Sequence, residues 1–418
     1  MQLSKYPEKH LSYCTNIHPG EDWNSVFKQL KSHLPELKQR LSSEKSFGIG
    51  LRLSAHAAED LLENDHVKEF KGWLQSEGLY VFTINGFPYG SFHGKKVKDN
   101  VYKPDWSTKE RLEYSSNLID ILDELLPDEG EGSISTSPVS YKYWGQSAEK
   151  FRKIKKVSSI HFAQLAWQMA EIFEKSGKDI HLDIEPEPDC LIENSEELID
   201  FFKKDLLPTG TEFLMSEHEI SLNEAENIIR RHIGVCYDTC HFALEYEDPA
   251  KAIQSFVDEG IRIGKTQISA ALKVKLDEER AGRSEIADHL EQFDEPTYLH
   301  QVIVKTDGES LVQFRDLPDA LPSIENDQAK EWRVHFHVPI FLKKYEELES
   351  TQDELLESLR LILDGNHCNH FEIETYTWDV LPEDLKTNIT DSIEREFRWV
   401  LDAINSPIEG STAKPGGV

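Results

Sequence analysis

Four short motifs place a carboxylate or an amide at the ends of strand-like runs. In IEPEP, Glu185 follows an alternating run and precedes Pro186. Side chains alternate faces along a strand, and proline cannot continue its hydrogen bonding, so Glu185 stands where that strand ends. Asp238 in CYDTCH, Gln267 in KTQIS and Glu374 in EIET are placed in the same way. Because α/β barrels keep their chemistry at the carboxyl ends of their strands, we expect these four side chains to meet.

These side chains offer oxygen atoms to a divalent cation, and His241 or His337 can add imidazole. Three carboxylates gathered without a cation would repel one another and raise one another's pKa values. Oxygen-rich sites with some imidazole suit magnesium, manganese or cobalt as well as zinc. We therefore predict a divalent metal site formed by Glu185, Asp238, Gln267 and Glu374.

Eight strand-then-helix units are expected to position the site. The strand-like runs begin at His10, Phe47, Leu79, Ser133, His181, Ile233, Ile261 and His370. Between them, apolar residues recur at helical spacing, for example over 23–40, 159–175 and 345–363. Alternating strands and helices predict a parallel sheet, and eight units fit a closed (β/α)8 TIM barrel.

Two segments interrupt this alternation. A long loop rich in Phe, Tyr, Trp and Gly follows the third strand and reaches Trp106. Between the seventh and eighth strands, two alternating runs flank Thr306–Gly308, which is a hairpin turn signal, and WRVHFHVPIF adds another strand-like piece. We predict one TIM-barrel domain over 1–405, with a β-hairpin insertion over approximately 275–342 and a flexible tail over 406–418.

Seven residues near the predicted strand ends are candidates for contacting a substrate. They are His18, Asn85, His93, Trp106, His241, Lys265 and His337. For the loop residues and His18, packing or helix capping is an equal alternative. His335 and His337 share one face of their strand, where they could reach a ligand or ordered water. For Lys265, pairing with Glu372 or Asp183 is favoured over substrate binding, because a buried lysine without an acid partner is costly.

The four motifs, in this order, resemble the metal-site strands of xylose-isomerase-like TIM barrels, a superfamily of sugar isomerases, epimerases and a branch of AP endonucleases. KTQIS is similar to hydroxypyruvate isomerases, in which a glutamine replaces a histidine of other members. Most of the chain resembles the EboE family, which is associated with metabolite-traffic gene clusters. That resemblance includes HLSYCTNIHPGEDW, TINGFPYGSFHG, SISTSPVSY, YDTCHFALEYEDP and HFHVPIF.

The superfamily resemblance implies a role for each site residue. Glu185 and Glu374 match two glutamates that bind the metal and also move a proton at a substrate carbon. Asp238 and Gln267 match the remaining metal ligands, and His241 matches a substrate-contacting histidine. A metal next to hydroxyl and carbonyl oxygens stabilises an enediolate, and a carboxylate can take or return the proton. The implied activity is that of a sugar or hydroxyketone isomerase or epimerase in a metabolite-traffic or secondary-metabolite pathway.

Two other functions remain open: a non-catalytic protein that holds a metabolite for transport, and a metal-dependent hydrolase of the AP-endonuclease-like branch. The chain has 46 Lys and Arg against 77 Asp and Glu, a formal charge of -31, which repels nucleic acid. No apolar run approaches the roughly 20 residues that span a bilayer, and the start lacks the apolar core of a signal peptide. We therefore expect a cytoplasmic protein with a small-molecule partner, and a homo-oligomer is left open.

Overall fold

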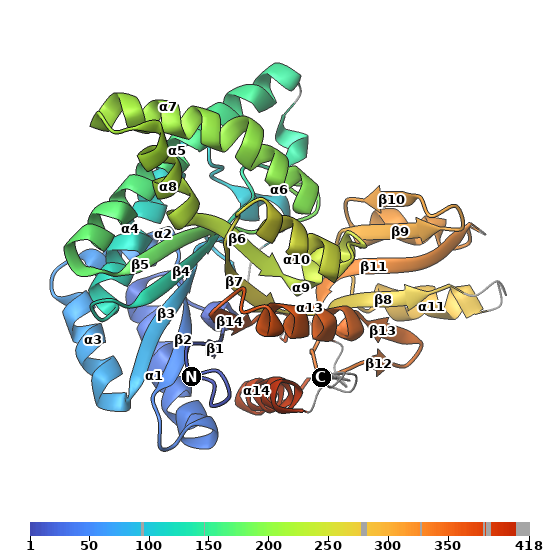
Figure 1. Ribbon diagram of the computed structural model, residues 1–418. Helices are drawn as coiled ribbons and strands as arrows, with labels where there is room; N and C mark the ends of the chain where they lie inside the picture. The colour runs from blue at the N-terminus through green and yellow to red at the C-terminus, as the bar shows by residue number, and fades with distance from the viewer. Residues whose placement is uncertain are drawn as a thin grey trace, which may run out of the picture.

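Eight parallel strands form the centre of the molecule in the computed structural model, which describes residues 1–92, 96–145, 147–276, 282–326, 328–378, 381 and 386–406 (Figure 1). The neighbours run β1-β14-β7-β6-β5-β4-β3-β2. An isolated parallel bridge between Cys14 and Gly50 joins the two end strands. The chain is thus a (β/α)8 TIM barrel, as predicted. Its strands are β1 (His10–Tyr13), β2 (Phe47–Arg52), β3 (Leu79–Asn85), β4 (Glu131–Thr136), β5 (Asp179–Ile184), β6 (Ile233–Asp238), β7 (Ile263–Ile268) and β14 (His370–Ile373).

Helices surround the strands (Figure 1). In the first, the apolar residues at helical spacing, Leu30, Leu34 and Leu37, are buried, and Asp22 caps the N-terminus by accepting the Ser25 N–H at 3.0 Å. None of the described helices is long and apolar enough to cross a membrane. The barrel helices are α1 (Trp23–Leu41), α2 (Ala55–Leu62), α3 (His66–Glu77), α4 (Lys109–Leu125), α5 (Ala148–Ser176), α6 (Ser195–Phe201), α7 (Leu207–His218), α8 (Leu222–His232), α9 (Thr239–Leu244), α10 (Pro249–Asp258), α13 (Gln352–Asp364) and α14 (Ile389–Asn405).

The insertion after β7 is a six-stranded antiparallel sheet beside the barrel, with the order β10-β9-β11-β8-β13-β12 (Figure 1). The predicted hairpin is present as β9 and β10. The sheet reaches further than the predicted 275–342, because its strands begin at Ala271 and end at Ser350. Its elements are β8 (Ala271–Lys275), α11 (Arg283–Glu291), β9 (Val302–Thr306), β10 (Leu311–Phe314), α12 (Leu317–Ala320), β11 (Ala329–His337), β12 (Lys344–Tyr345) and β13 (Leu348–Ser350).

The helix predicted over 345–363 starts later than the apolar spacing indicated. Residues 344–350 form the short hairpin of β12 and β13, in which Glu346 adopts a positive φ of 51°. Helix α13 therefore begins only at Gln352. These residues pair with β8 as strands instead of joining the helix. The spacing of apolar residues within the segment does not reveal this pairing with a distant strand.

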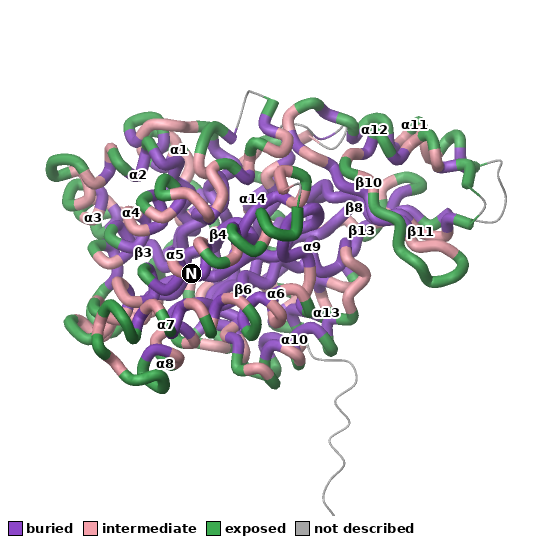
Figure 2. The backbone as a smooth tube through the Cα atoms, turned by 90° about the horizontal axis from the view of Figure 1, so that it is seen from above, coloured by how far each residue is buried: buried purple, intermediate pink, exposed green. Residues whose placement is uncertain are grey.

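The barrel strands are buried on both faces, and the buried backbone runs through the middle of the molecule (Figure 2). The apolar side of each strand faces the helices, whereas the lumen holds polar groups. Lys265 and Glu372 form an ion pair there at 2.6 Å, with both side chains fully buried. A Cβ at Gly50 would overlap Oε1 of Glu372, so this strand position has room only for glycine.

The loop after β3 and the inserted sheet pack on each other over the barrel mouth. The backbone N–H groups of Val97 and Lys98 donate to the carbonyl oxygen of Thr297 at 2.8 and 2.9 Å. The Lys98 ammonium pairs with Asp316 at 2.6 Å. Within this loop, the 3-10 turn η2 (Lys98–Tyr102) directs Tyr102 inward. The two interruptions of the βα alternation therefore form one roof over the strand ends.

Candidate active site

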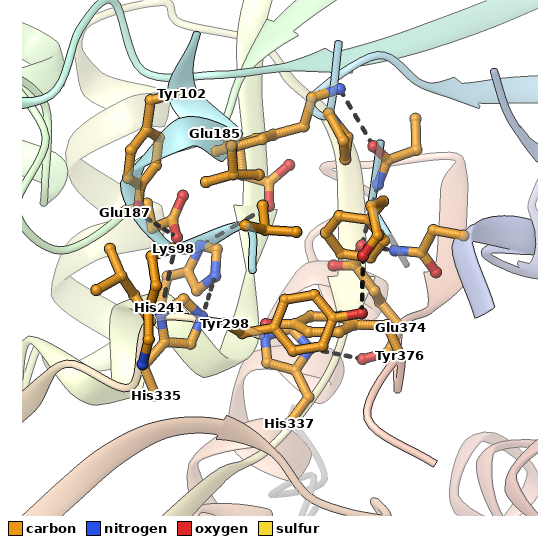
Figure 3. Close-up of a pocket in the computed structure, with 18 residues that line it drawn as sticks. Lys98, Tyr102, Glu185, Glu187, His241, Tyr298, His335, His337, Glu374 and Tyr376 are labelled. Atoms are coloured by element: carbon orange, nitrogen blue, oxygen red, sulfur yellow. Dashed lines mark hydrogen bonds and ion pairs between the residues drawn. The ribbon is translucent and has the colours of Figure 1, made fainter. Parts of the chain in front are cut away.

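A cavity lies at the carboxyl ends of the strands and under this roof (Figure 3). The segments that follow the strands supply its acidic groups and Tyr376, and the roof supplies Phe87, Phe92, Tyr102 and Tyr298. Residues lining it include Asn16, Asn85, Phe87, Phe92, Lys98, Tyr102, Glu185, Glu187, His241, Tyr298, His335, His337, Glu374 and Tyr376.

Three of the four predicted metal ligands come together, and two of them, Glu185 and Glu374, line the cavity. Glu185 directly follows β5, Asp238 ends β6 and Glu374 directly follows β14. One carboxylate oxygen of each lies within 4.8 Å of the other two, and all three side chains are buried. This is the spacing at which a single cation can contact all three oxygens.

Asp238 is held by the start of helix α9. Its Oδ1 accepts the backbone N–H groups of Cys240 and His241 at 2.8 and 3.1 Å and the Ser269 hydroxyl at 2.6 Å. Among the described residues, no donor reaches its other oxygen, Oδ2, or Oε2 of Glu185. A buried carboxylate oxygen without a donor is costly, and a bound cation removes that cost. The donor set thus fits a divalent metal.

Glu374 is held by donors from three distant parts of the chain. Asn16 and Asn85 donate their amide N–H groups to its Oε1 at 2.8 and 3.0 Å. Gln267 donates its amide nitrogen to Oε2. The amide oxygen of Gln267 instead accepts the Cys236 thiol at 2.9 Å. Gln267 therefore contacts the predicted site, but its amide would have to rotate before its oxygen could bind a metal.

Burial raises the pKa of Glu185 well above its ordinary value, and the negative charges of Glu374 and Asp238 raise it further. Burial and Asp238 likewise raise the pKa of Glu374. Burial also acts to raise the pKa of Asp238, but His241, His337 and its hydrogen bonds outweigh burial and lower it. The two glutamates therefore retain protons at higher pH than exposed carboxyls do, which suits groups that exchange protons near neutral pH.

Three buried histidines form the wall next to the carboxylates. His337 donates Nδ1–H to the carbonyl oxygen of Glu374 at 2.7 Å, and its Nε2 has no partner among the described residues. His241 bonds through Nδ1 to the carbonyl oxygen of Pro186 at 2.9 Å. Its Nε2 lies 3.2 Å from Nε2 of His335. Asp238, His241 and His337 can also offer three ligand atoms within 4.8 Å of one another.

Two predicted substrate contacts are packing residues instead. Trp106 is fully buried against Phe162 of α5, at 4.1 Å between ring centroids, and it does not line the cavity. Nε2 of His18 forms a hydrogen bond of 2.8 Å with the Tyr13 hydroxyl, and the His18 ring stacks on the ring of His33. Both corrections have the same physical reason: each ring packs on a neighbouring aromatic ring of an outer helix instead of facing the cavity.

The remaining predicted contacts divide between the cavity and the barrel interior. Asn85 and His337 line the cavity, as His241 does. Lys265 lies below the cavity in its ion pair with Glu372, which is the pairing that the sequence favoured. His93 lies outside the described residues.

Sequence reasoning missed Asn16, Glu187 and Tyr102 as residues of the site. Glu187 is the second glutamate of IEPEP and lies two residues after Glu185, so strand alternation would have predicted that both face the same side. It accepts the Tyr102 hydroxyl at 2.9 Å, and burial raises its pKa to about 8. Asn16 is 358 positions from the Glu374 that it contacts, and no local pattern links the two.

No protein-family model matches this chain, and no curated protein does. Among solved structures, it is similar to a xylose isomerase-like TIM barrel protein from Mycobacterium smegmatis in complex with magnesium, with 9% identity over 95% of this chain and 96% of that chain and a TM-score of 0.49. It is also similar to the IOLI protein with a binding zinc atom, with 13% identity over 94% of this chain and 98% of that chain and a TM-score of 0.48. A D-tagatose 3-epimerase-like protein has 12% identity over 94% of this chain and 97% of that chain, with a TM-score of 0.47.

Likenesses of this degree say nothing about the reaction or the ligand, and the strand order itself establishes the barrel. The resemblance to the EboE family stays a prediction.

Proposed function

We propose that this barrel is a divalent-metal-dependent isomerase or epimerase that moves a proton at a carbon beside the carbonyl of a small sugar or hydroxyketone. The observation that carries the proposal is the buried trio of Glu185, Asp238 and Glu374, whose ligand oxygens lie within 4.8 Å of one another. Glu185 and Glu374 also line the cavity. Magnesium, manganese, cobalt and zinc all suit such oxygen ligands. The EboE resemblance adds a proposed context, a cytoplasmic step in metabolite traffic.

When bound, the metal polarises the substrate's oxygens and so lowers the cost of removing a proton from the adjacent carbon. Glu185 and Glu374 are the proposed proton carriers, because both line the cavity and the superfamily resemblance gives them that role. Asn16 and Asn85 hold Glu374 in one orientation through its Oε1. Tyr298 and Tyr376, which line the cavity, exclude bulk water from the site.

A metal-dependent hydrolase is the second candidate. The three histidines beside the carboxylates favour it, because hydrolysis at a metal centre often uses more imidazole ligands than proton transfer does. Its substrate would not be nucleic acid, since the described lining has Lys98 as its only cation and that cation is paired with Asp316.

The test begins with elemental analysis of the purified protein. The protein is then incubated with candidate ketoses in deuterated water, and NMR follows deuterium entering the carbon beside the carbonyl. We expect metal and exchange in the wild type, and loss of exchange in Glu374→Gln and Glu185→Gln. Glu396→Gln is the matched control, because Glu396 is a buried carboxyl that does not line the cavity.

Metal without exchange on any substrate would exclude the isomerase and would leave the hydrolase and a metabolite-binding protein as the candidates. Exchange that persists in both glutamine variants would exclude these carboxylates as the proton carriers.

A further inference from the structure

The loop after β3 and residues 298–299 line their part of the cavity with apolar side chains. These side chains form two small clusters that are separate from the main core of the barrel, and Val101 packs against both clusters. Four of them are buried, with exposed fractions of 5–7%. We call this part of the lining the apolar wall, and its residues are Phe87, Phe92, Val97, Val101, Tyr298 and Leu299.

The hydrogen-bonding groups in and beside the apolar wall are already engaged with other parts of the protein. Tyr298 donates its hydroxyl to a backbone carbonyl oxygen at 3.1 Å. Tyr102 donates its hydroxyl to Glu187 at 2.9 Å, and the Lys98 ammonium is paired with Asp316 at 2.6 Å. A ligand that placed several hydroxyl groups against this wall would therefore give up hydrogen bonds to water and find few replacements.

The unpartnered polar atoms of the lining belong to a different set of residues (Figure 3). They are Oδ1 of Asn16, Oε2 of Glu185, Oε2 of Glu187 and Nε2 of His337, which are all buried and have no hydrogen-bond partner among the described residues. None of these atoms belongs to the apolar wall. Because buried polar atoms without a partner are costly, these are the atoms that a bound ligand or ion would satisfy. The lining thus has a polar part with unused hydrogen-bonding capacity and an apolar part with very little.

We propose that the substrate of this site is an amphipathic hydroxyketone. Its hydroxyl and carbonyl oxygens lie at the polar part of the lining, and a hydrocarbon substituent, aromatic or aliphatic, lies against the apolar wall. A plain sugar would bury hydroxyl groups against that wall at a cost, whereas a hydrocarbon group gains free energy there by leaving water. The inference rests on the proposed function for the hydroxyketone end of the ligand and goes beyond it by specifying the other end.

The experiment compares four hydroxyketones that share one reacting group, by calorimetric titration of the purified protein. Hydroxyacetone carries that group alone, and erythrulose extends it with hydroxyl groups. The other two, 1-hydroxy-4-phenylbutan-2-one and 1-hydroxy-4-cyclohexylbutan-2-one, extend it with a hydrocarbon ring. We expect both ring-bearing ligands to bind at least about 10-fold more tightly than the other two, because burying one ring removes enough apolar surface from water for that difference. The tighter of the two then identifies the substituent as aromatic or aliphatic.

Val101→Thr tests whether the ring lies against the apolar wall. The substitution keeps the shape of the side chain but places a hydroxyl group between the two apolar clusters, so the preference for the ring-bearing ligands should fall about fivefold or more. Val312→Thr is the matched control and should keep the full preference. Val312 lies on β10, is 44% exposed and does not line the cavity.

Deuterium exchange on the same four ligands reports on the proposed reaction separately. A preference for the rings without exchange on any ligand would exclude the isomerase but support the amphipathic ligand. Equal affinities for all four ligands, or no binding of the ring-bearing pair, would overturn this inference whether or not exchange occurs, and would show that the apolar wall only packs the roof. An unchanged preference in Val101→Thr would place the ring elsewhere and would also overturn it. The wild-type comparison decides the matter if that variant does not fold.

Discussion

Lys265 and Glu372 provide the sharpest test of how the barrel interior supports the site. Their charged atoms lie 2.6 Å apart, one layer below the carboxylates, and both side chains are 0% exposed. The principal perturbation is Lys265→Met, which leaves the Glu372 carboxylate buried without its counter-charge. Glu372→Gln and the double variant complete a thermodynamic cycle.

The magnitudes follow from the geometry. At an effective dielectric constant of about 20, charges at this separation attract by on the order of 6 kcal/mol, and the cost of desolvating two ions is of similar size. The pair as a whole therefore adds little net stability. When one partner is removed, the other charge stays buried and nothing offsets its desolvation cost. Each single variant should therefore lose about 3–5 kcal/mol of unfolding free energy. The double variant should stay within about 2 kcal/mol of the wild type.

Urea unfolding followed by tryptophan fluorescence measures these free energies, since the chain has 8 tryptophans. Metal content and deuterium exchange should survive in the double variant, because Lys265 lies below the cavity. Additive losses in the double variant would refute the ion-pair argument. A stable double variant that binds metal but does not exchange would show that the ion pair also contributes to the reaction.

Three further predictions concern single residues. Burial raises the pKa of Glu396 to about 8, so the folded chain keeps a proton that the unfolded chain releases above about pH 4.5. This group should therefore lower stability from about pH 4.5 to about pH 8, by up to about 1.4 kcal/mol per pH unit. Urea unfolding at several pH values should show a slope smaller by that amount in Glu396→Gln, because other buried carboxyls such as Glu187 keep their own contributions. Gly50→Ala should destabilise by more than about 1 kcal/mol, because the new methyl group meets Glu372; a melting temperature equal to the wild type's would contradict this. Asn85→Ala should weaken manganese binding about 10- to 100-fold by calorimetry, because it frees Glu374 from one of its donors, and unchanged affinity would remove Asn85 from the site.

The barrel was predictable from the sequence because its signals are local. Segments in which apolar residues recur at every second position alternate with segments in which they recur at helical spacing. Prolines mark strand ends such as the one after Glu185. Side chains alternate between the two faces of a strand, so the order of residues is enough to assign Asp238 and Glu374 to the lumen face at the barrel mouth. The hairpin of β9 and β10 was predictable for the same reason, since its turn lies within a few residues.

Contacts between distant segments were not predictable. Trp106 belongs to the same loop as Phe87, Phe92 and Tyr102, which line the cavity, and only packing against α5 decides that Trp106 is structural. The inserted sheet reaches Ala271 and Ser350 because β8 pairs with both β11 and β13. The local sequence of a strand does not specify which other strands it pairs with.

The sequence by itself therefore determined the barrel, the order of its strands along the chain and the parity that brings Glu185, Asp238 and Glu374 to one rim. The tertiary structure alone decided that Asn16 orients Glu374 and that Gln301 turns His335 toward His241. The physical reason is range: periodicity and turn chemistry act over a few bonds, whereas hydrogen-bond donors and ligand atoms meet only after the chain has folded back on itself.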